Sequence, residues 1–421
     1  MSTHESQNTM DPSSNIEENI EEGRGAYQVG GFHPVYVGDL YHGKYEVLSK
    51  IGYGVYSTVW LVRDREEQAD EKKYRALKVL SAECYGQGTD IFEREILRHL
   101  RNGSQTEAGY RYVCHLIDDF EHKGPNGTHV CLIFELMGET LASFGVWLAN
   151  QRIPYELMRK WTLQLIYALD FAHGCNVIHT DLKPDNIFVK YRDFSLIEKD
   201  YLVEMPLPKQ NRDEESYTPV MSVPLRWSYF NEDQGKDVFG FDIVLGDWGV
   251  SSWADKHLTE FIQPVKLRAP ECLIQAPWDA KVDVWNLGAI VLELYRNVRM
   301  FSGRIRPDGR YDVRQHLAEI ADFFGPFPQD LLQRGSQSLV KDFFDDEGRV
   351  KGAQPVTRPG LSSEYFTPGM DEDLRRDFVA FMQAVMKINP RERPSPEEML
   401  KLPWLDAKGT GTGMNYQSGT S

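Results

Sequence analysis

The sequence predicts an α+β fold in two lobes, with strands in the first lobe and helices in the second. Between residues 45 and 135, short runs of alternating apolar residues are separated by turns that contain glycine, which is typical of β-strands. From residue 157 to residue 173 the apolar residues follow helical intervals instead, at Trp161, Leu165, Ile166 and Leu169. The change of period predicts a strand-rich lobe over residues 27–137 and a helical lobe over residues 138–405.

Composition and charge narrow the class of protein. With 421 residues, 41% hydrophobic and 12% aromatic, the chain can bury one large or two ordinary cores. The formal net charge of -16 argues against direct nucleic-acid binding, because phosphate backbones need clustered Lys and Arg. An acidic chain is compatible with a basic protein substrate, although the same charge also simply keeps a protein dispersed.

Cysteine usage and the lack of long apolar runs indicate a soluble intracellular chain. The 5 cysteines are scattered without C-x-x-C spacing, which favours reduced thiols over a disulfide framework or a zinc site. No run approaches the roughly 18 apolar residues that span a bilayer, and no basic-then-apolar leader is seen. We therefore expect a monomer in the cytoplasm, the nucleus or both, without membrane contact.

Both ends of the chain have the composition of disordered tails. Residues 1–26 almost lack aromatic and branched apolar residues, and residues 406–421 are polar and rich in glycine. The N-terminal stretch carries an acidic run, which we interpret as part of a solvated tail rather than a docking motif. This run consists of Glu17, Glu18, Glu21 and Glu22.

A glycine-rich turn after residue 51 has the form of a loop folded over nucleotide phosphates. Gly52 and Gly54 would let the backbone approach the phosphates, where a side chain would block it. Ser57 replaces the third glycine of this pattern, which weakens the match but keeps a small residue with a hydroxyl donor. We assign these three residues, with Ile51 and Val59 beside them, to nucleotide binding.

A lysine inside an apolar strand strengthens this interpretation. Lys78 lies in the expected strand 74–80, where an unpaired ammonium would be costly, so we expect an anionic partner. A lysine that snorkels at a strand edge is the alternative, but the preceding loop favours a contact with the α- and β-phosphates. The helical stretch 91–100 offers Glu95, our choice of partner, and Glu93 as the alternative.

Two further strands are expected at residues 114–120 and 129–135, joined across a turn at residues 124–127. The second strand would end in a hinge that offers backbone groups to adenine. The apolar residues here are equally good core candidates, so the assignment depends on position alone. The residues assigned to the adenine pocket are Ala76, Phe134, Glu135 and Met137.

A polar loop between two apolar segments, residues 177–190, has the composition of a catalytic loop for phosphoryl transfer. Such a reaction requires an oriented acceptor hydroxyl, neutralised charge and a held metal ion. Asp181 can accept the hydroxyl proton, Lys183 can meet phosphate oxygens, and Asn186 can hold Mg²⁺. A surface loop built from common turn residues is the alternative.

A second metal ligand is expected after a long insertion. Residues 191–240 are mixed in charge and contain several prolines, and a segment of this length is usually functional or disordered. The apolar strand that follows ends at Asp247, Trp248 and Gly249, and Asp247 is well placed to chelate Mg²⁺ that bridges phosphates.

Three polar residues are expected in the interior of the second lobe. Glu271 follows Ala269 and Pro270, and Asp283 lies near the start of an apolar helix. We expect Arg393 to pair with Glu271, and Asp283 to hold the backbone of the catalytic loop. A contact at the surface is the alternative for any one such pair.

Taken in order, these motifs resemble the signature set of eukaryotic protein kinases over residues 27–405. The resemblance implies a bilobal protein-kinase fold and an MgATP-dependent serine/threonine kinase acting on protein substrates, with Lys183 favouring Ser/Thr over Tyr. It implies catalytic roles for Lys78, Glu95, Asp181 and Lys183, with ATP and Mg²⁺ as cofactors. The residues it implies to be structural are His179, Thr180, Gly249, Glu271, Asp283 and Arg393.

A closer resemblance is to the SR-protein kinase family. It is carried by residues 30–35, 38–40 and 43–45, by Ser57–Leu61 and residues 126–129, and by the sequence Ile178, His179, Thr180, Asp181. The resemblance implies serine substrates in Arg/Ser-rich segments, as in splicing factors, and hence a role in mRNA splicing regulation. The chain departs from the family in its short spacer and in the basic residues mixed into 304–314, although Asp342, Asp345, Asp346 and Glu347 could supply part of an acidic groove.

Thr180 stands where many kinases have the arginine that binds an activation-segment phosphate. Threonine cannot make that charge-assisted contact. We therefore expect an active state that forms without phosphorylation of the activation segment, residues 250–268. A pseudokinase or scaffold, and a small-molecule phosphotransferase, are the alternative functions.

Overall fold

The computed structural model describes residues 21–86, 91–144, 153–205, 210–212, 217–225, 238–296, 299–356 and 358–405. Residues 1–20 of the predicted N-terminal tail and the whole predicted tail at 406–421 lie outside these ranges. Within them, no helix is long and apolar enough to cross a membrane. The chain forms two compact units. The first unit comprises Met1–Gly103, Val113–Trp147 and Phe188–Gly249, and the second comprises Ser104–Tyr112, Leu148–Ile187 and Val250–Ser421.

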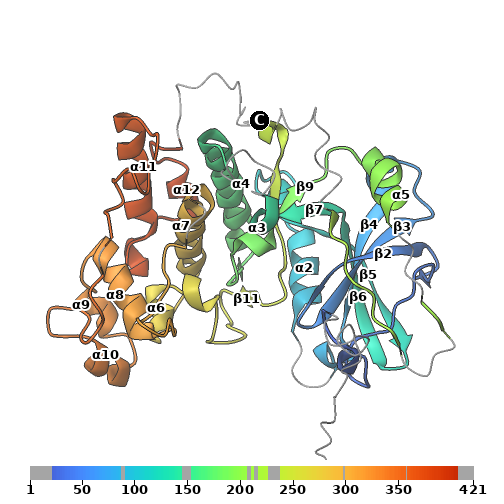
Figure 1. Ribbon diagram of the computed structural model, residues 1–421, viewed down its shortest axis with the longest axis horizontal. Coiled ribbons are helices and arrows are strands. Elements are labelled where there is room, and N and C mark those ends of the chain that lie inside the picture. Colours follow the sequence, from blue (N-terminus) through green and yellow to red (C-terminus); the bar gives the residue numbers. More distant parts are fainter. Residues whose placement is uncertain are drawn as a thin grey trace, which may run out of the picture. The chain divides into compact units, whose positions relative to one another are not determined.

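The first unit is built on a six-stranded antiparallel sheet with the order β1-β2-β3-β4-β6-β5 (Figure 1). Its tight hairpins lie at the glycine-containing turns that the sequence predicted. Gly54 pairs with Ser57 between β2 and β3, and Gly124 pairs with Gly127 between β5 and β6. The strands are β1 (Leu40–Tyr41), β2 (Tyr45–Gly54), β3 (Ser57–Asp64), β4 (Tyr74–Leu80), β5 (Leu116–Gly124) and β6 (Gly127–Glu135).

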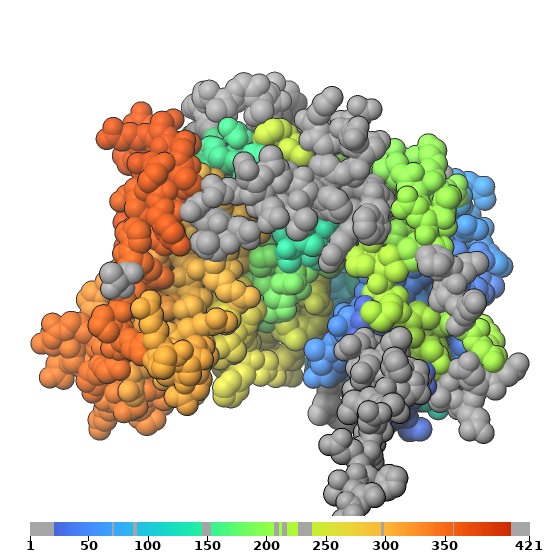
Figure 2. All heavy atoms as spheres, in the orientation of Figure 1, coloured from blue at the N-terminus to red at the C-terminus, as the bar shows by residue number. Residues whose placement is uncertain are grey.

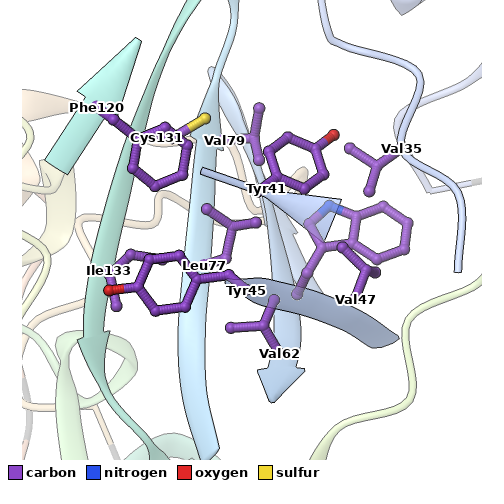
Figure 3. Packing of buried hydrophobic residues seen from close by; sticks show 11 residues of the cluster. Val35, Tyr41, Tyr45, Val47, Val62, Leu77, Val79, Phe120, Cys131 and Ile133 are labelled. Carbon is purple, nitrogen blue, oxygen red and sulfur yellow. The ribbon is translucent and has the colours of Figure 1, made fainter. Parts of the chain in front are cut away.

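The alternation of side chains gives the sheet two different faces. On β4, Leu77 and Val79 pack into a buried apolar cluster with residues of β1, β2, β3, β5 and β6 (Figure 3). Because successive side chains point to opposite faces, Lys78 lies on the face away from this cluster. The cluster consists of Val35, Tyr41, Tyr45, Val47, Trp60, Val62, Leu77, Val79, Phe120, Cys131 and Ile133.

Short elements complete the first unit. Helix α2 (Glu93–Arg101) lies beside the sheet, where Arg98 Nε donates to Asp119 of β5 at 3.0 Å (Figure 1). A second, three-stranded sheet has the order β10-β9-β7. The remaining elements are α1 (Asp70–Lys73), β7 (Met137–Thr140), α3 (Leu141–Phe144), β9 (Ile187–Lys190), a π-helical turn (Ile197–Tyr201), α5 (Leu202–Glu204) and β10 (Ile243–Leu245).

The insertion belongs to the first unit, although it was predicted as part of the helical lobe. Its described residues lie on the surface of this unit, where Figure 2 shows them in green and yellow-green next to the blue atoms of the N-terminal part. Tyr201 Oη, for example, is 3.0 Å from Ser49 Oγ of β2. Residues 206–209, 213–216 and 226–237 of the insertion lie outside the described ranges.

The prediction of a solvated acidic tail is wrong for Glu21 and Glu22. Both carboxylates form ion pairs with Lys50 of β2, at 3.1 Å and 2.6 Å, and the side chain of Glu22 is only 2% exposed. Composition suggested disorder because the residues around these carboxylates are polar, and the cation that orders them is far along the sequence. Residues 24–26 form a 3₁₀ turn within the region predicted as tail.

The second unit is mainly helical, as predicted. Gly288 in α7 lets this helix approach the end of α11, because a Cβ at this position would lie 2.5 Å from Cγ of Met386. The elements are α4 (Tyr155–Gly174), β8 (Val177–Ile178), β11 (Ser252–Trp253), α6 (Pro270–Leu273), α7 (Lys281–Arg296), α8 (Val313–Phe324), α9 (Gln329–Leu332), α10 (Gln337–Phe343), α11 (Glu372–Val385) and α12 (Pro396–Met399). The α+β class, with strands in the first part and helices in the second, is therefore confirmed.

Candidate active site

The first unit holds Lys78 between two carboxylates. In the register of the sheet Lys78 pairs with Val59 of β3, the strand that leaves the glycine-rich turn. Lys78 Nζ lies 2.7 Å from Glu93 Oε1 and 3.1 Å from Asp247 Oδ1. Burial alone would lower the pKa of Lys78, but the two carboxylates outweigh it, so its pKa is raised and the ammonium stays charged.

The choice of Glu95 as the partner of Lys78 is wrong, and the alternative, Glu93, makes the ion pair. Helix α2 buries Ile96, Leu97 and Leu100, and these lie three, four and seven residues after Glu93. Residues at that spacing share a helix face, so Glu93 points inward with them. The side chain of Glu95 is 40% exposed and accepts a hydrogen bond from Tyr85 Oη. This apolar spacing was visible in the sequence and would have selected Glu93.

Glu93→Gln should therefore lower kcat/KM for ATP by roughly tenfold or more, since a buried charge-assisted hydrogen bond contributes about 1.5–3 kcal/mol. Glu95→Gln is the matched control on the same helix and should stay within about twofold of wild type, because exposed polar contacts contribute little. Steady-state kinetics with varied ATP make the comparison. A larger loss in the Glu95 variant would contradict the ion pair seen here.

Asp247 follows β10 in an uncommon backbone conformation. Its φ is 55°, in the left-handed region, and such strain is characteristic of functional sites. Its side chain contacts Lys78 and is 44% exposed. Gly249, two residues on, passes close to Glu93, since a Cβ there would lie 3.3 Å from Glu93 Oε2. A side chain at residue 249 would crowd the partner of Lys78.

The residues predicted for nucleotide binding fall on adjacent strands of the first unit. Gly52 pairs with Val59, Val59 with Lys78, and Ala76 with Phe134. Because directly paired residues share a face, Val59 and Lys78 lie together on one face of the sheet. Ile51 lies within β2 and Gly54 is its last residue. Ser57 is the first residue of β3 and has a buried side chain, and Glu135 is the last residue of β6.

A small apolar cluster surrounds Phe134 and Met137. It also contains Cys114, Val244 and Phe188, which the sequence alone did not assign to the site. Phe188 was the easiest to find, because it lies two residues after Asn186 at the start of a strand. Val244 lies in β10, three residues before Asp247. A buried apolar residue there could belong to the core or to the site, and the sequence alone does not distinguish the two.

The second unit carries the catalytic loop, and Asp181 is its most constrained carboxylate. Asp181 Oδ2 accepts hydrogen bonds from Lys183 Nζ at 2.7 Å and from Asn186 Nδ2 at 2.9 Å. Asn186 Nδ2 also donates to the Asp181 carbonyl at 2.9 Å. The structure thus brings together the three residues predicted for this loop. Asp181 Oδ1 accepts no hydrogen bond from the described residues, so it can accept a proton from a bound hydroxyl.

Asp283 holds the backbone of this loop, as predicted. Its carboxylate accepts from the backbone N–H groups of His179 and Thr180 at 2.8 Å and 2.9 Å, and lies 3.0 Å from His173 Nε2. Burial would raise the pKa of Asp283, but the contacts with His173 and His179 outweigh it and lower the pKa below its usual value. The fixed carboxylate stabilises Thr180 at a φ of 62°, which is unusual for a β-branched residue.

The same loop is tied to the start of the activation segment. Thr180 Oγ1 donates to the Val250 carbonyl at 2.7 Å, and Ser251 Oγ donates to the His179 carbonyl at 3.2 Å. Strand β8 then pairs with β11, with Ile178 opposite Ser252. Within the described part of the second unit, direct hydrogen bonds therefore join the two segments.

The predicted contact between Glu271 and Arg393 is present in the interior of the second unit. The guanidinium and the carboxylate form two parallel hydrogen bonds of 2.7 Å, and both side chains are 0% exposed. Arg393 also donates to the carbonyls of Lys387, Lys281 and Ile388, so all five of its N–H donors are used.

Comparisons with known proteins agree with this arrangement. The family model described as the protein kinase domain matches residues 45–215 and 230–405. A serine/threonine protein kinase of Aspergillus fumigatus (strain CBS 144.89 / FGSC A1163 / CEA10) is 34% identical, covering 92% of this chain and 91% of the relative. The serine/threonine-protein kinase SRPK of Physarum polycephalum is 29% identical, with 93% of each chain covered. A kinase domain solved by crystallography shares the fold, with a TM-score of 0.63 at 21% identity over 88% of this chain and 98% of that one. The chain therefore belongs to the protein kinase family and is a serine/threonine protein kinase.

Proposed function

We propose that this kinase transfers the γ-phosphate of ATP to serine hydroxyls in Arg/Ser-rich protein segments, and that it does so without activation-segment phosphorylation. The observation that carries the catalytic part is the geometry of Asp181. Two donors fix one carboxylate oxygen, and the other is left for the proton of the acceptor hydroxyl.

The remaining polar residues fit the handling of MgATP. Lys78, kept charged by Glu93, would contact the α- and β-phosphates. Asp247 of the first unit and the amide oxygen of Asn186 of the second would each offer a ligand to Mg²⁺, which would neutralise charge on the phosphates. Both suit this role, because Asp247 is partly exposed and Asn186 uses its amide nitrogen, rather than its oxygen, toward Asp181. Lys183 would contact the transferred phosphate next to Asp181, the proposed base.

The substrate class is proposed from the likeness to SR-protein kinases. The relatives include a protein named SRSF protein kinase 3 in Homo sapiens, 23% identical with 90% of this chain covered. The predicted acidic groove gives this class little support, because Arg314 pairs with Asp342 at 2.9 Å and Arg349 pairs with Asp345 at 2.8 Å. The proposal therefore does not place substrate docking at those carboxylates.

The ties between Thr180 and Val250 support the proposed independence from phosphorylation. In kinases with an arginine at this position, a phosphate on the activation segment orders the segment through a charge-assisted contact. In this chain the threonine hydroxyl reaches the segment directly, at 2.7 Å from the Val250 carbonyl. A hydrogen bond between a hydroxyl and a carbonyl forms without a phosphate group.

Phosphatase treatment of the purified kinase should accordingly leave its kcat unchanged within about twofold, because no phosphate takes part in the ties around Thr180. Activity is measured on a peptide after the phosphatase has been removed, and loss of phosphate is checked by mass spectrometry. A large fall in kcat would refute independence from phosphorylation. As a positive control, Thr180→Val should lower activity on the order of tenfold, since it leaves the Val250 carbonyl without its donor.

The substrate class is tested with two serine peptides of equal length and charge, one with Arg/Ser repeats and one with Lys in place of Arg. We expect a higher kcat/KM for the Arg peptide, because a planar guanidinium makes bidentate contacts that an ammonium cannot. Equal values would overturn the Arg/Ser assignment. Absence of phosphate transfer to either peptide and to a mixed protein substrate would overturn the proposed activity.

A further inference from the structure

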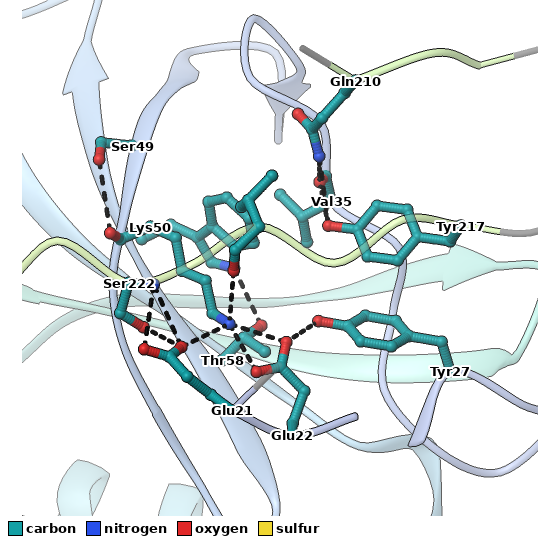
Figure 4. A network of polar contacts seen from close by, with 12 residues as sticks. Glu21, Glu22, Tyr27, Val35, Ser49, Lys50, Thr58, Gln210, Tyr217 and Ser222 are labelled. Carbon is teal, nitrogen blue, oxygen red and sulfur yellow. Dashed lines mark hydrogen bonds and ion pairs between the residues drawn. The ribbon is translucent and has the colours of Figure 1, made fainter. Parts of the chain in front are cut away.

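Lys50 of β2 is a lysine whose side chain is 0% exposed and whose charge is met by two other segments of the first unit (Figure 4). Lys50 Nζ lies 3.1 Å from Glu21 Oε2, 2.6 Å from Glu22 Oε2 and 3.0 Å from the Val220 carbonyl. An ammonium has three N–H donors, and each acceptor group takes one of them. A buried charge is tolerated only when it is paired and hydrogen-bonded in this way.

The two carboxylates are satisfied in turn by their own neighbours. Glu21 Oε2 accepts from Ser222 Oγ at 2.6 Å and from the Ser222 backbone N–H at 3.1 Å. Glu22 accepts from the hydroxyl of Tyr27. The site is therefore complete within the described residues and joins residues 21–27, β2 and residues 217–223 of the insertion. We call these contacts the Lys50 clamp.

Further hydrogen bonds hold the insertion along the same surface. The Val223 N–H donates to the Lys50 carbonyl at 2.8 Å, and Tyr201 Oη donates to the Val223 carbonyl at 2.7 Å. Tyr217 Oη donates to the Val35 carbonyl at 2.7 Å (Figure 4). Val220 packs against the apolar cluster of the sheet. The insertion thus replaces solvent along this side of β2.

The position of the clamp along β2 links it to the glycine-rich turn. Lys50 pairs with Trp60 and Gly52 pairs with Val59, so the register shifts between them and Ile51 is an extra residue. Such a β-bulge bends the strand and sets the direction of the residues beyond it. In this chain the bulge leads into the turn from Gly52 to Ser57, and the clamp holds the residue immediately before the bulge.

We infer that Lys50 is a positioning residue for ATP binding, which acts by fixing the direction of β2 where it enters the glycine-rich turn. The inference rests on the proposed use of ATP. Because Lys50 pairs with Trp60, it lies on the face of the apolar cluster, away from Lys78, and does not meet the nucleotide. Its partners give the N-terminal segment and the insertion a role inside the first unit, as parts of the support of the nucleotide loop.

Breaking the clamp should raise KM for ATP while changing kcat at saturating ATP much less. The glycine-rich turn binds phosphates in both the ground state and the transition state, and loss of such uniform binding appears mainly in KM. We expect the double variant Glu21→Gln/Glu22→Gln to raise KM on the order of tenfold, with kcat within about threefold of wild type. Lys50→Met should show the same split.

The matched control is Glu46→Gln. Glu46 lies on the same strand, but its partners Arg63 and Arg65 have side chains that are 37% and 52% exposed. An exposed pair of this kind contributes little, so KM for ATP should stay unchanged. Where Lys50→Met fails to fold, the milder Glu21→Gln tests the same contact, because Glu21 is the more exposed of the two carboxylates at 16% against 2%.

Amide hydrogen exchange of the ATP-free protein gives a second readout that needs no catalysis. Breaking the clamp should speed exchange in residues 48–58 and in residues 217–223 together, and Glu46→Gln should change neither. Unchanged exchange in 48–58 in the clamp variants would overturn the inference, as would an equal fall in kcat and kcat/KM. If the wild-type protein transferred no phosphate, the proposed function would fail, while the exchange result would still decide whether the clamp orders the turn.

Discussion

Asp181→Asn should lower kcat for phosphate transfer by roughly 10²- to 10⁴-fold, because a positioned general base contributes about that much to a rate. The amide keeps the shape of the side chain but cannot accept the proton of the substrate hydroxyl. Its contacts with Lys183 and Asn186 involve Oδ2, so ATP affinity should change little. Initial rates at saturating ATP and peptide measure the loss.

Asp185→Asn is the matched control for this prediction. Asp185 lies in the same loop, within the 3₁₀ turn Pro184–Asn186, but its side chain is exposed. Its kcat should remain within about threefold of wild type, as expected for an exposed side chain outside the catalytic contacts. Equal losses in the two variants would show that the loop is sensitive to any charge change, and Asp181 would lose its assignment as the base.

Arg393→Met should destabilise the second unit by about 3–5 kcal/mol, the usual loss when one partner of a buried ion pair is removed. The variant leaves the Glu271 carboxylate at 0% exposure without its two 2.7 Å hydrogen bonds. Equilibrium unfolding in urea, followed by a probe in the second unit, measures the change in midpoint at constant m value.

The double variant Glu271→Met/Arg393→Met tests the physical reason. It removes both charges, so no carboxylate stays buried and unpaired, and it should lose less stability than Arg393→Met alone. Arg349→Met, which removes the ion pairs that a 67% exposed side chain makes with Asp345 and Glu347, should leave the midpoint nearly unchanged. A double variant as unstable as the single one would mean that packing, rather than unpaired charge, sets the loss.

The sequence identified the site residues that can be recognised from their immediate neighbours in the chain. Lys78 could be found because a cation in an apolar strand is costly, and Asp181, Lys183 and Asn186 because they occur together in one short loop. The contact of Arg393 with Glu271 and that of Asp283 with the backbone of the catalytic loop were also predicted, and the structure contains both.

The residues that were predicted wrongly depend on the rotational phase of a helix or on partners far along the sequence. Glu95 was chosen over Glu93 because the phase of α2 was treated as open, although its buried apolar residues define it. Glu21 and Glu22 were assigned to a tail because of the composition around them, and their partner Lys50 lies far along the sequence. The burial of Lys50 depends on segments on both sides of it in the chain, and neither has a periodic pattern that predicts where it packs.

The Lys50 clamp also constrains how this sequence can change over evolutionary time. Loss of Lys50 alone would leave two carboxylates without their ion-pair partner, and loss of the carboxylates would leave a buried ammonium unpaired. A change at one position alone therefore leaves a buried charge without its partner, and a lineage that deletes the insertion also loses the Val220 carbonyl that accepts from Lys50. Among relatives, a lysine at this position should therefore occur together with an acidic N-terminal pair.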